Sequence, residues 1–431
     1  MKKAAFYTLG CKVNQYETEA MEELFSANGY ELCPFTEKAD VYIINTCSVT
    51  NMSDRKSRQI IRRAKKTNPN AIIAVTGCYA QTAPDEVLKI DGVNLVIGNQ
   101  DKKDIVSRVE ELSSGDKNND VLDIMNAHEF EDLKITKYTD RTRAFIKIQD
   151  GCSQFCSYCI IPYARGPVRS RPEHEIIDEI HSLIKNGFTE IILVGIHVAS
   201  YGKDLGNTSL EQLLLEIDKI DGIRRTRLSS IEPMTLDAEF VRKISGCSKL
   251  CPHFHISLQS GCDETLRRMN RHYTTAQYKE VVDGLRKAFP DVAITTDIMV
   301  GFAGETDEEF NQTVQFVKEI EFSGAHIFQY SQRRGTPAAK RPNQVSPQIK
   351  EKRSAEIIAI TKKSEQKFHE GFLGRTMEVL FEQTAKDGFW EGKTPNYITV
   401  YVKSSEDLQG QYRNVKLLKA DSGIVYGELE V

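Results

Sequence analysis

The stretch GCSQFCSYCII occupies residues 151–161 and contains three closely spaced cysteines, Cys152, Cys156 and Cys159. It directly follows the strand-like run RAFIKIQD (143–150). Three thiolates in so short a loop can converge on one metal centre, but a structural zinc ion would need a fourth ligand, and no adjacent Cys or His supplies it. Three cysteines that hold a [4Fe–4S] cluster leave one iron open for a non-protein ligand. The spacing therefore favours such a cluster over zinc or a group of packed thiols.

The sequence around this loop alternates strand-like and helical segments up to about residue 330. The six strand-like runs are RAFIKI (143–148), EIILV (190–194), RTRLSS (225–230), HFHISL (253–258), VAITTDIMV (292–300) and AHIFQY (325–330). Six strand–helix repeats are too few to close an eight-stranded barrel. We therefore predict an open (βα)6 partial barrel whose reactive face lies at the carboxyl ends of its strands. One long polar helix is predicted to follow at 347–370.

A separate series of strand-like and helical segments fills the first 112 residues. Its predicted strands are 4–9, 41–45, 71–76 and 94–97, and its clearest helical patterns are 15–28 and 53–66. Alternation of this kind indicates a parallel α/β domain whose sheet is covered on both faces.

Three more cysteines follow the predicted strands of this first domain. Cys11, Cys47 and Cys78 each lie just past the carboxyl end of a strand, the edge where α/β folds collect their ligands. The pattern predicts a second three-cysteine cluster rather than unrelated packing thiols. Gly10 and Gly77 precede two of these cysteines and permit tight turns there. The remaining thiols, Cys33, Cys247, Cys251 and Cys262, are interpreted as ordinary packing residues.

The last sixty residues consist of short alternating segments at 375–383, 396–403, 413–420 and 423–431, separated by Gly, Ser and Asp turns. They predict a small antiparallel β-barrel, a shape often used to bind oligonucleotides. The segment SSGDKNND (113–120) is small and polar, which indicates a linker. The predicted division is an N-terminal domain at 1–113, a linker at 114–137, a core at 138–370 and the barrel at 371–431.

The overall charge does not indicate a protein that coats nucleic acid. The 431 residues include 57 Lys and Arg against 61 Asp and Glu, for a net charge of −4. Any RNA contact must therefore come from local patches. One patch is the run RKSRQIIRRAKK (55–66), which could equally be a solvated helix face with no RNA contact. The other patch lies just past the three-cysteine loop. The candidate RNA-binding residues are Arg55, Lys56, Arg58, Arg62, Arg63, Arg165, Arg169 and Arg171.

Membrane association is not expected. No uninterrupted apolar stretch approaches the roughly 18 residues of a membrane span, and the apolar run after Met1 is interrupted too early for a secretory signal. The sequence predicts a cytoplasmic protein with no membrane partner.

The spacing Cx3Cx2C, with Tyr158 before its last cysteine and a six-fold βα series after it, resembles the radical S-adenosylmethionine enzymes. The resemblance implies that the open iron chelates S-adenosylmethionine and that an electron donor such as flavodoxin or ferredoxin drives its cleavage to a 5′-deoxyadenosyl radical. Strand-end passages that match the fold's cofactor contacts add further candidates. The cofactor-binding candidates are Tyr158, Gly195, Ser230, Glu232, Gln259 and Gly301.

Two cysteine sets and a C-terminal barrel together resemble the methylthiotransferases, along essentially the whole chain. The phrases that carry this resemblance are TLGCKVNQYETE (8–19), CSQFCSYCIIPYARGPVRSR (152–171) and HISLQSGCDETLRRMNRHYT (255–274). They look most like the branch that acts on N6-threonylcarbamoyladenosine at position 37 of the tRNA anticodon loop. The family implies two [4Fe–4S] clusters, a sulfur source and an RNA-binding TRAM domain.

The implied reaction replaces the C2–H of this adenine by S–CH3, giving 2-methylthio-N6-threonylcarbamoyladenosine. That hydrogen has no acidic pKa to exploit, so radical chemistry is required, and no side chain beyond the cluster ligands is assigned a catalytic role. The alternatives are the same chemistry on N6-isopentenyladenosine 37 or on a ribosomal-protein aspartate, and a non-catalytic Fe–S protein that binds RNA or senses redox state. A sensor has no need for an open-iron site on a βα scaffold, which disfavours the last.

Overall fold

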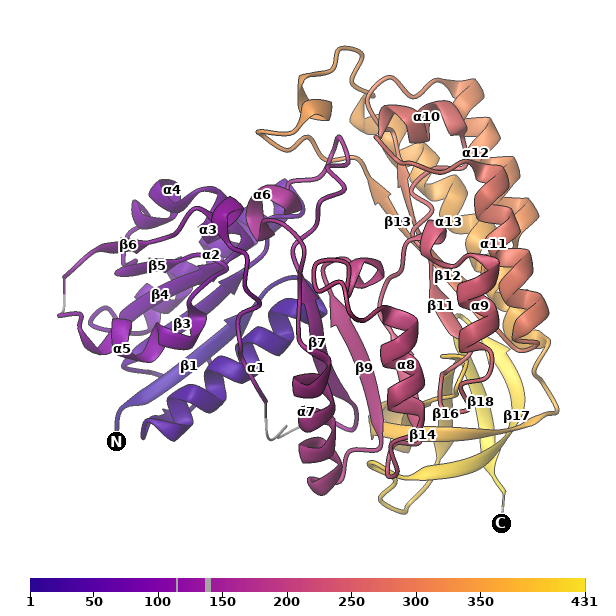
Figure 1. Cartoon of the computed structure of the whole chain (residues 1–431), viewed down its shortest axis with the longest axis horizontal. Helices are drawn as coiled ribbons and strands as arrows, with labels where there is room; N and C mark the ends of the chain where they lie inside the picture. The colour runs from indigo at the N-terminus through magenta and orange to yellow at the C-terminus, as the bar shows by residue number, and fades with distance from the viewer. Residues whose placement is uncertain (114, 136–140, 431) are drawn as a thin grey trace.

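The computed structural model describes residues 1–113, 115–135 and 141–430. Parts of the predicted linker (114, 136 and 137), the predicted start of the core (138–140) and residue 431 of the last predicted strand lie outside the described residues. The described chain folds into three parts (Figure 1), and none of its helices is long and apolar enough to cross a membrane.

The N-terminal part contains a six-stranded parallel sheet in the order β2-β1-β3-β4-β5-β6. Its strands are β1 Lys3–Thr8, β2 Glu31–Leu32, β3 Val41–Thr46, β4 Ile72–Gly77, β5 Leu95–Ile97 and β6 Asn118–Asp120. Its helices are α1 Lys12–Ala27, α2 Asn51–Thr67, α3 Cys78–Thr82, α4 Pro84–Leu88, α5 Ile105–Glu110 and the 3-10 turn η1 Lys102–Asp104. Apolar clusters fill both faces of the sheet, one including residues of α1 and α5 and the other residues of α2 and α3, as predicted.

Strand β6 was not predicted, because it lies within the polar segment 113–120 that indicated a linker. It pairs with β5 at the edge of the sheet, where Asn119 opposes Val96. An edge strand can be held by backbone hydrogen bonds alone, so its side chains need no apolar alternation and leave no signal in the sequence. The short stretch after it includes the 3-10 turn η2 Ile124–Asn126.

The central part is the predicted open partial barrel. Six parallel strands run in the order β7-β9-β10 and β11-β12-β13, and two parallel bridges, Thr226 to Leu250 and Ile231 to Ile256, join the halves. The strands are β7 Ala144–Asp150, β9 Glu190–Gly195, β10 Arg225–Leu228, β11 His253–His255, β12 Ala293–Val300 and β13 Gly324–Gln329. The short antiparallel strand β8, Arg169–Ser170, pairs with β7 and was not predicted.

Helices cover the outside of this partial barrel over one large apolar core. They are α6 Ile161–Arg165, α7 Glu173–Lys185, α8 Leu210–Asp218, α9 Ala238–Ile244, α10 Asp263–Arg268, α11 Thr275–Ala288, α12 Asp307–Ile320 and α13 Pro347–Glu370, with 3-10 turns η3 Val198–Ser200, η4 Pro233–Thr235 and η5 Pro337–Lys340. Helix α13 has the bounds that the sequence predicts. It packs along β13 and leads into the C-terminal part.

The C-terminal part is a closed five-stranded barrel in the order β14-β15-β16-β18-β17. Its strands are β14 Thr376–Thr384, β15 Phe389–Lys393, β16 Thr399–Lys403, β17 Tyr412–Asp421 and β18 Ile424–Leu429, with the 3-10 turn η6 Lys386–Gly388. The prediction of a purely antiparallel barrel is wrong in one pair, because β16 and β18 run parallel. Strand β15 was missed because it is short and contains Gly392, which sheets disfavour.

A buried arginine fixes this barrel to the core. The guanidinium of Arg227 donates hydrogen bonds to the carbonyls of Thr394 and Pro395, at 2.8 and 2.7 Å, and pairs with Glu190 at 2.6 Å. Further bridges between the core and the barrel are Arg143 to Glu382 (2.8 Å), Arg225 to Glu378 (3.0 Å) and Arg375 to Asp291 (2.6 Å). The barrel therefore docks where strands β7 and β10 begin.

Replacing Arg227 by Met tests this junction. The change removes both bonds to the barrel and leaves the buried Glu190 carboxylate short of a partner, so we expect a loss of about 3–5 kcal/mol in the free energy of unfolding. The matched control is Arg375→Met, which removes an exposed bridge between the same two parts and should cost less than about 1 kcal/mol. Urea unfolding measures both. Equal losses would show that burial of the Arg227 contacts does not matter.

Candidate active site

The structure brings Cys11, Cys47 and Cys78 together at one edge of the N-terminal sheet. They follow β1, β3 and β4, which are neighbours in the sheet. Burial, together with the nearby thiols of Cys78 and Cys11, raises the pKa of Cys47 to about 11. Gly10 has a φ of +103°, and a Cβ there would lie 3.0 Å from the Cys47 sulfur; Gly77 has a φ of +93°. Both glycines thus form the tight turns that the sequence predicts.

The loop of Cys152, Cys156 and Cys159 follows β7. Its backbone is held by hydrogen bonds from the Cys152 N–H to the Gly166 carbonyl, at 3.0 Å, and from the Cys159 N–H to the Cys156 carbonyl, at 2.9 Å. Burial, together with the neighbouring cysteines of the loop, raises the pKa of Cys159 to about 12. The three thiols of this loop thus lie within electrostatic range of one another.

N–H groups are directed at one sulfur of each cysteine set. Arg165 Nε and Asn99 Nδ2 lie 3.4 and 3.7 Å from the Cys78 sulfur, and Arg271 Nη1 lies 3.4 Å from that of Cys156. Such donors stabilise negative charge on thiolates that ligate a metal. Among the described residues, no three His, Cys, Asp or Glu side chains are close enough to hold a single metal ion. Three soft thiols with N–H donors fit an iron–sulfur cluster at each set.

A buried ion network connects the two sets. Arg165 ends helix α6, just after the second cysteine loop, and pairs with Glu17 of α1 and, at 3.2 Å, with Asp150 of β7. Lys147 bridges the same carboxylates at 2.7 and 2.6 Å, and Lys102 lies 3.4 Å from Glu17. Burial alone would raise the pKa of Glu17, but its three cationic partners hold that pKa well below the ordinary value.

This network corrects the prediction that Arg165, Arg169 and Arg171 contact RNA. All three are buried, Arg165 completely. Arg169 donates to backbone carbonyls, and Arg171 pairs with Glu179 of α7. None has an exposed guanidinium with which to reach a phosphate. Arg165 joins the N-terminal part to the core, whereas these contacts of Arg169 and Arg171 lie within the core.

The basic helix α2 remains available for RNA. Arg55, Lys56, Arg62 and Arg63 are exposed. Arg58 is half-buried and donates to the hydroxyl of Tyr79 at 3.0 Å. The exposure of these side chains fits both RNA contact and a solvated helix face. Cys247, Cys251 and Cys262 are buried, which confirms them as packing thiols, and Cys33 is half-buried.

Three of the cofactor candidates lie in or beside the candidate site. Gly195 and Ser230 line a large cavity described below. Glu232 accepts a hydrogen bond from His197 at 2.7 Å, and lies 3.4 Å from Arg271, whose other amino group contacts the Cys156 sulfur. Glu232 is therefore connected to the second cysteine loop through Arg271. Arg271 and His197 were not predicted. Arg271 lies in the loop between helices α10 and α11, and His197 lies in the loop that follows strand β9.

The other three candidates, Tyr158, Gln259 and Gly301, contact other residues of the core. The ring of Tyr158 packs edge-on against Phe302, with centroids 6.3 Å apart. Gln259 has a φ of +63° and its backbone bridges to β12. Gly301 has a φ of +68°, and a Cβ there would meet the Lys350 side chain at 2.3 Å. Close packing against α13 thus accounts for this glycine, and the structure does not bring it to the large cavity.

A cavity of about 940 Å³ opens between all three parts of the chain. Gly10, Cys11 and Lys12 line it from the N-terminal part, and Lys393, Asn396 and Tyr397 from the C-terminal barrel. The core lines it with the inner faces of β10 to β13, including His255, Asp297, His326 and Phe328. The cavity can therefore receive a substrate beside the first cysteine set.

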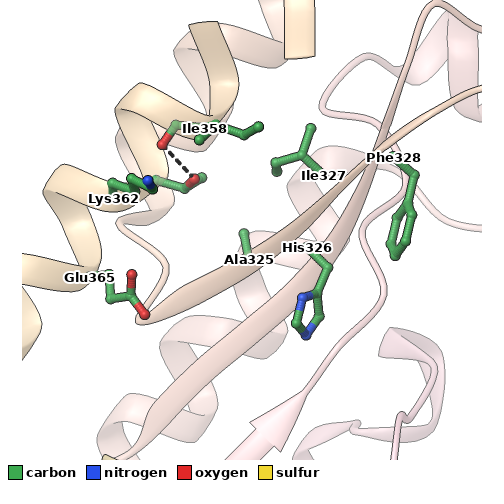
Figure 2. Close-up of a pocket in the computed structure, with 8 residues that line it drawn as sticks. Ala325, His326, Ile327, Phe328, Ile358, Lys362 and Glu365 are labelled. Carbon is green, nitrogen blue, oxygen red and sulfur yellow. Dashed lines mark hydrogen bonds between the residues drawn. The ribbon is translucent and has the colours of Figure 1, made fainter. Parts of the chain in front are cut away.

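A smaller pocket of about 300 Å³ lies between β13 and α13. Figure 2 shows Ile327 pointing toward Ile358 of the helix, whereas His326 and Phe328 point away from it. The alternation of a strand places these last two side chains on the opposite face, where they line the large cavity. Strand β13 thus lies between the smaller pocket and the large cavity.

Comparison with known proteins agrees with this architecture. A profile described as Uncharacterized protein family UPF0004 matches residues 3–98, the Radical SAM superfamily matches 146–317, and the TRAM domain matches 371–429. The solved structure of the radical S-adenosylmethionine methyltransferase TsrM from Kitasatospora setae superposes with a TM-score of 0.58 at 15% identity, covering 79% of this chain and 77% of that one, which shows a shared fold. The partial barrel and its cysteine loop define a radical S-adenosylmethionine enzyme.

Curated relatives cover nearly the whole chain. The threonylcarbamoyladenosine tRNA methylthiotransferase MtaB of Bacillus subtilis is 43% identical over 434 residues, 99% of this chain and 96% of the relative. The Thermotoga maritima enzyme of the same name is 39% identical, with 99% and 96% covered. A tRNA-2-methylthio-N(6)-dimethylallyladenosine synthase of Clostridium botulinum is 37% identical, with 98% and 95% covered. This chain belongs to the tRNA methylthiotransferase family, which confirms the resemblance seen in the sequence.

Replacing Glu17 by Gln tests the ion network between the cysteine sets. It leaves buried cations without their shared carboxylate, so we expect a loss of about 3–5 kcal/mol in the free energy of unfolding at pH 7. Because the folded-state pKa of Glu17 lies below its unfolded value, the wild-type contribution is complete above about pH 4.5 and is lost as the pH falls toward the folded value.

The measurement is urea unfolding of both proteins between pH 7 and pH 3.5. The difference between them should shrink below pH 4.5. Glu216→Gln, at an exposed pair with Lys219, is the control and should change stability by less than about 1 kcal/mol at every pH. A difference for Glu17→Gln that stays constant with pH would contradict the assigned charge of this carboxylate.

Proposed function

We propose that this enzyme replaces the C2 hydrogen of N6-threonylcarbamoyladenosine at position 37 of tRNA by a methylthio group. The observation that carries the proposal is a cavity between the three parts of the chain, lined by Cys11 of the first cysteine set, in a chain that has a second three-cysteine loop after β7 and is 43% identical to a relative of that name. Relatives named for dimethylallyladenosine are 37% identical, so the same chemistry on that base is the second candidate.

Cys152, Cys156 and Cys159 would hold one [4Fe–4S] cluster, and Cys11, Cys47 and Cys78 a second. When bound with S-adenosylmethionine, these groups would supply the radical that removes the C2 hydrogen and the sulfur that replaces it. The residues of the chain position and shield the reactants. Arg271 would hold the Cys156 thiolate and Glu232 in fixed relation, and the walls of the cavity would limit the access of water.

The tRNA would bind across the parts that surround the cavity. Adenine 37 lies in the single-stranded anticodon loop, where a base can leave its stack and enter a pocket at modest cost. The exposed cations of α2 and the C-terminal TRAM barrel would contact phosphates. Tyr158, Gly195, Ser230, Glu232, Gln259 and Gly301 remain the proposed contacts of S-adenosylmethionine.

Further parts of the proposal concern partners and organisation. Reduction would need an electron donor such as flavodoxin or ferredoxin, and turnover a sulfur source, and both fit a cytoplasmic location. The proposed domains are the core at 138–370, the barrel at 371–431 and the N-terminal domain, predicted at 1–113, which β6 extends to Asp120. The family matches at 3–98, 146–317 and 371–429 support this division.

Iron content tests the two cluster sites. We expect about eight irons per chain after anaerobic reconstitution, because each set would hold four. Replacing Cys152, Cys156 and Cys159 by Ala should halve the iron and abolish 5′-deoxyadenosine formation. Replacing Cys11, Cys47 and Cys78 should also halve the iron but leave some cleavage of S-adenosylmethionine. The control Cys247→Ala changes a packing thiol and should keep all eight. A triple variant with full iron would refute its site.

The substrate is tested by mass spectrometry of nucleosides from tRNA incubated with the reconstituted enzyme. We expect 2-methylthio product from tRNA that carries threonylcarbamoyladenosine, and little or none from the same transcript with adenosine or isopentenyladenosine. A site built around polar groups rejects a substrate that leaves them unpaired. Comparable product from the isopentenyl transcript would overturn the choice of substrate and leave the reaction class intact.

A further inference from the structure

Four cationic side chains surround the ring of Tyr397 in the large cavity. The charged groups of Arg227, Lys393 and Arg143 lie 4.9, 5.1 and 5.6 Å from the centre of the ring. Burial favours the neutral phenol of Tyr397, yet its pKa is lowered. The charges of Arg143, Lys12 and Lys393 cause that shift, so Lys12 also lies nearby. This group of residues joins the N-terminal part, the core and the barrel.

The four cations differ in their partners. The two arginines pair with carboxylates, one with Glu382 at 2.8 Å and the other with Glu190 at 2.6 Å. Within the described parts of the chain, Lys12 and Lys393 take part in no ion pair, and Lys393 donates to the hydroxyl of Thr399 at 2.6 Å. Both lysines line the cavity. The cavity therefore contains two ammonium groups that form no ion pair with the described residues. The carboxylate of Glu382, which the charge of Lys393 influences, is already paired with Arg143 at 2.8 Å.

The two acidic residues that line the cavity are engaged or distant. Asp297 lies 3.2 Å from His255 and accepts a hydrogen bond from Ser257. Burial raises the pKa of Glu365, and the one cation that opposes this shift is Lys362 rather than either lysine of the cavity. An anion that enters the cavity would thus find Lys12 and Lys393 available.

We propose that Lys12 and Lys393 bind the carboxylate of the threonylcarbamoyl group and thereby select this substrate, an inference that rests on the proposed function. The threonylcarbamoyl group carries a carboxylate and a hydroxyl, whereas an isopentenyl group is apolar. Charge-assisted hydrogen bonds from two ammonium groups fit a carboxylate. An isopentenyl group would leave both lysines desolvated and unpaired. Because Lys12 directly follows Cys11, the bound substituent would lie beside the first cysteine set.

The test measures binding of anticodon stem–loops to the full-length, reconstituted protein by fluorescence anisotropy. Four loops differ only at position 37, which carries threonylcarbamoyladenosine, its carboxamide analogue, isopentenyladenosine or adenosine. Wild type should bind the first loop at least about tenfold more tightly than the carboxamide loop. The double variant Lys12→Met with Lys393→Met should lose this preference and still bind the adenosine loop.

Two controls separate selection from general effects of charge and folding. Lys403→Met removes an exposed lysine of β16 outside the cavity lining, and should change all four affinities by the same factor. Lys393→Arg keeps the charge and should keep the preference. Binding of S-adenosylmethionine, whose carboxylate is the other possible ligand, should be unchanged in the double variant.

The outcomes distinguish this inference from the proposed function. If wild type does not prefer the threonylcarbamoyl loop over the isopentenyl loop, the proposed substrate fails. If wild type has that preference and the double variant retains it, only the role of the lysines is overturned. Loss of S-adenosylmethionine binding with retained selection among the loops would also overturn it, by showing that the lysines hold the cofactor.

Discussion

The relative placement of the two cysteine sets depends on the buried contact of Arg165 with Glu17. Arg165 ends the helix after the second cysteine loop, and Glu17 lies in the helix that begins after Cys11. The same guanidinium contacts the Cys78 sulfur. A buried ion network does not have to be more stable than an apolar core, but the removal of one member is costly. The network thus favours one arrangement of the two domains, and with it one position of the first cysteine set relative to the second.

Basic residues of this chain serve two different purposes. Arg165 and Arg227 are buried and hold domains together, Arg165 through the Glu17 carboxylate and Arg227 through the carbonyls of Thr394 and Pro395. Lys12 and Lys393 face a cavity instead. Arginine suits the first role because its planar group makes several fixed hydrogen bonds, whereas a lysine on a flexible stem suits a ligand that comes and goes.

The sequence predicts the fold well where local patterns decide it. The six strands of the partial barrel, the parallel N-terminal sheet and helix α13 all appear where hydrophobic periodicity places them. Strands β6 and β15 were not predicted, because β6 is a polar edge strand and β15 is short and contains Gly392. The cysteine sets could be predicted because the ends of parallel strands meet at one edge. The ion network could not, because Glu17 and Arg165 are 148 residues apart and only tertiary structure pairs them.

Under the proposed function, the two cysteine sets belong to one site. Pulsed dipolar EPR spectroscopy of the reconstituted, reduced protein tests this placement directly, because magnetic coupling between two paramagnetic clusters falls steeply with their separation. We expect strong coupling in the wild type, and its disappearance when either set of three cysteines is replaced by Ala. Two clusters that are both reduced yet magnetically independent would contradict the placement of both sets in one site.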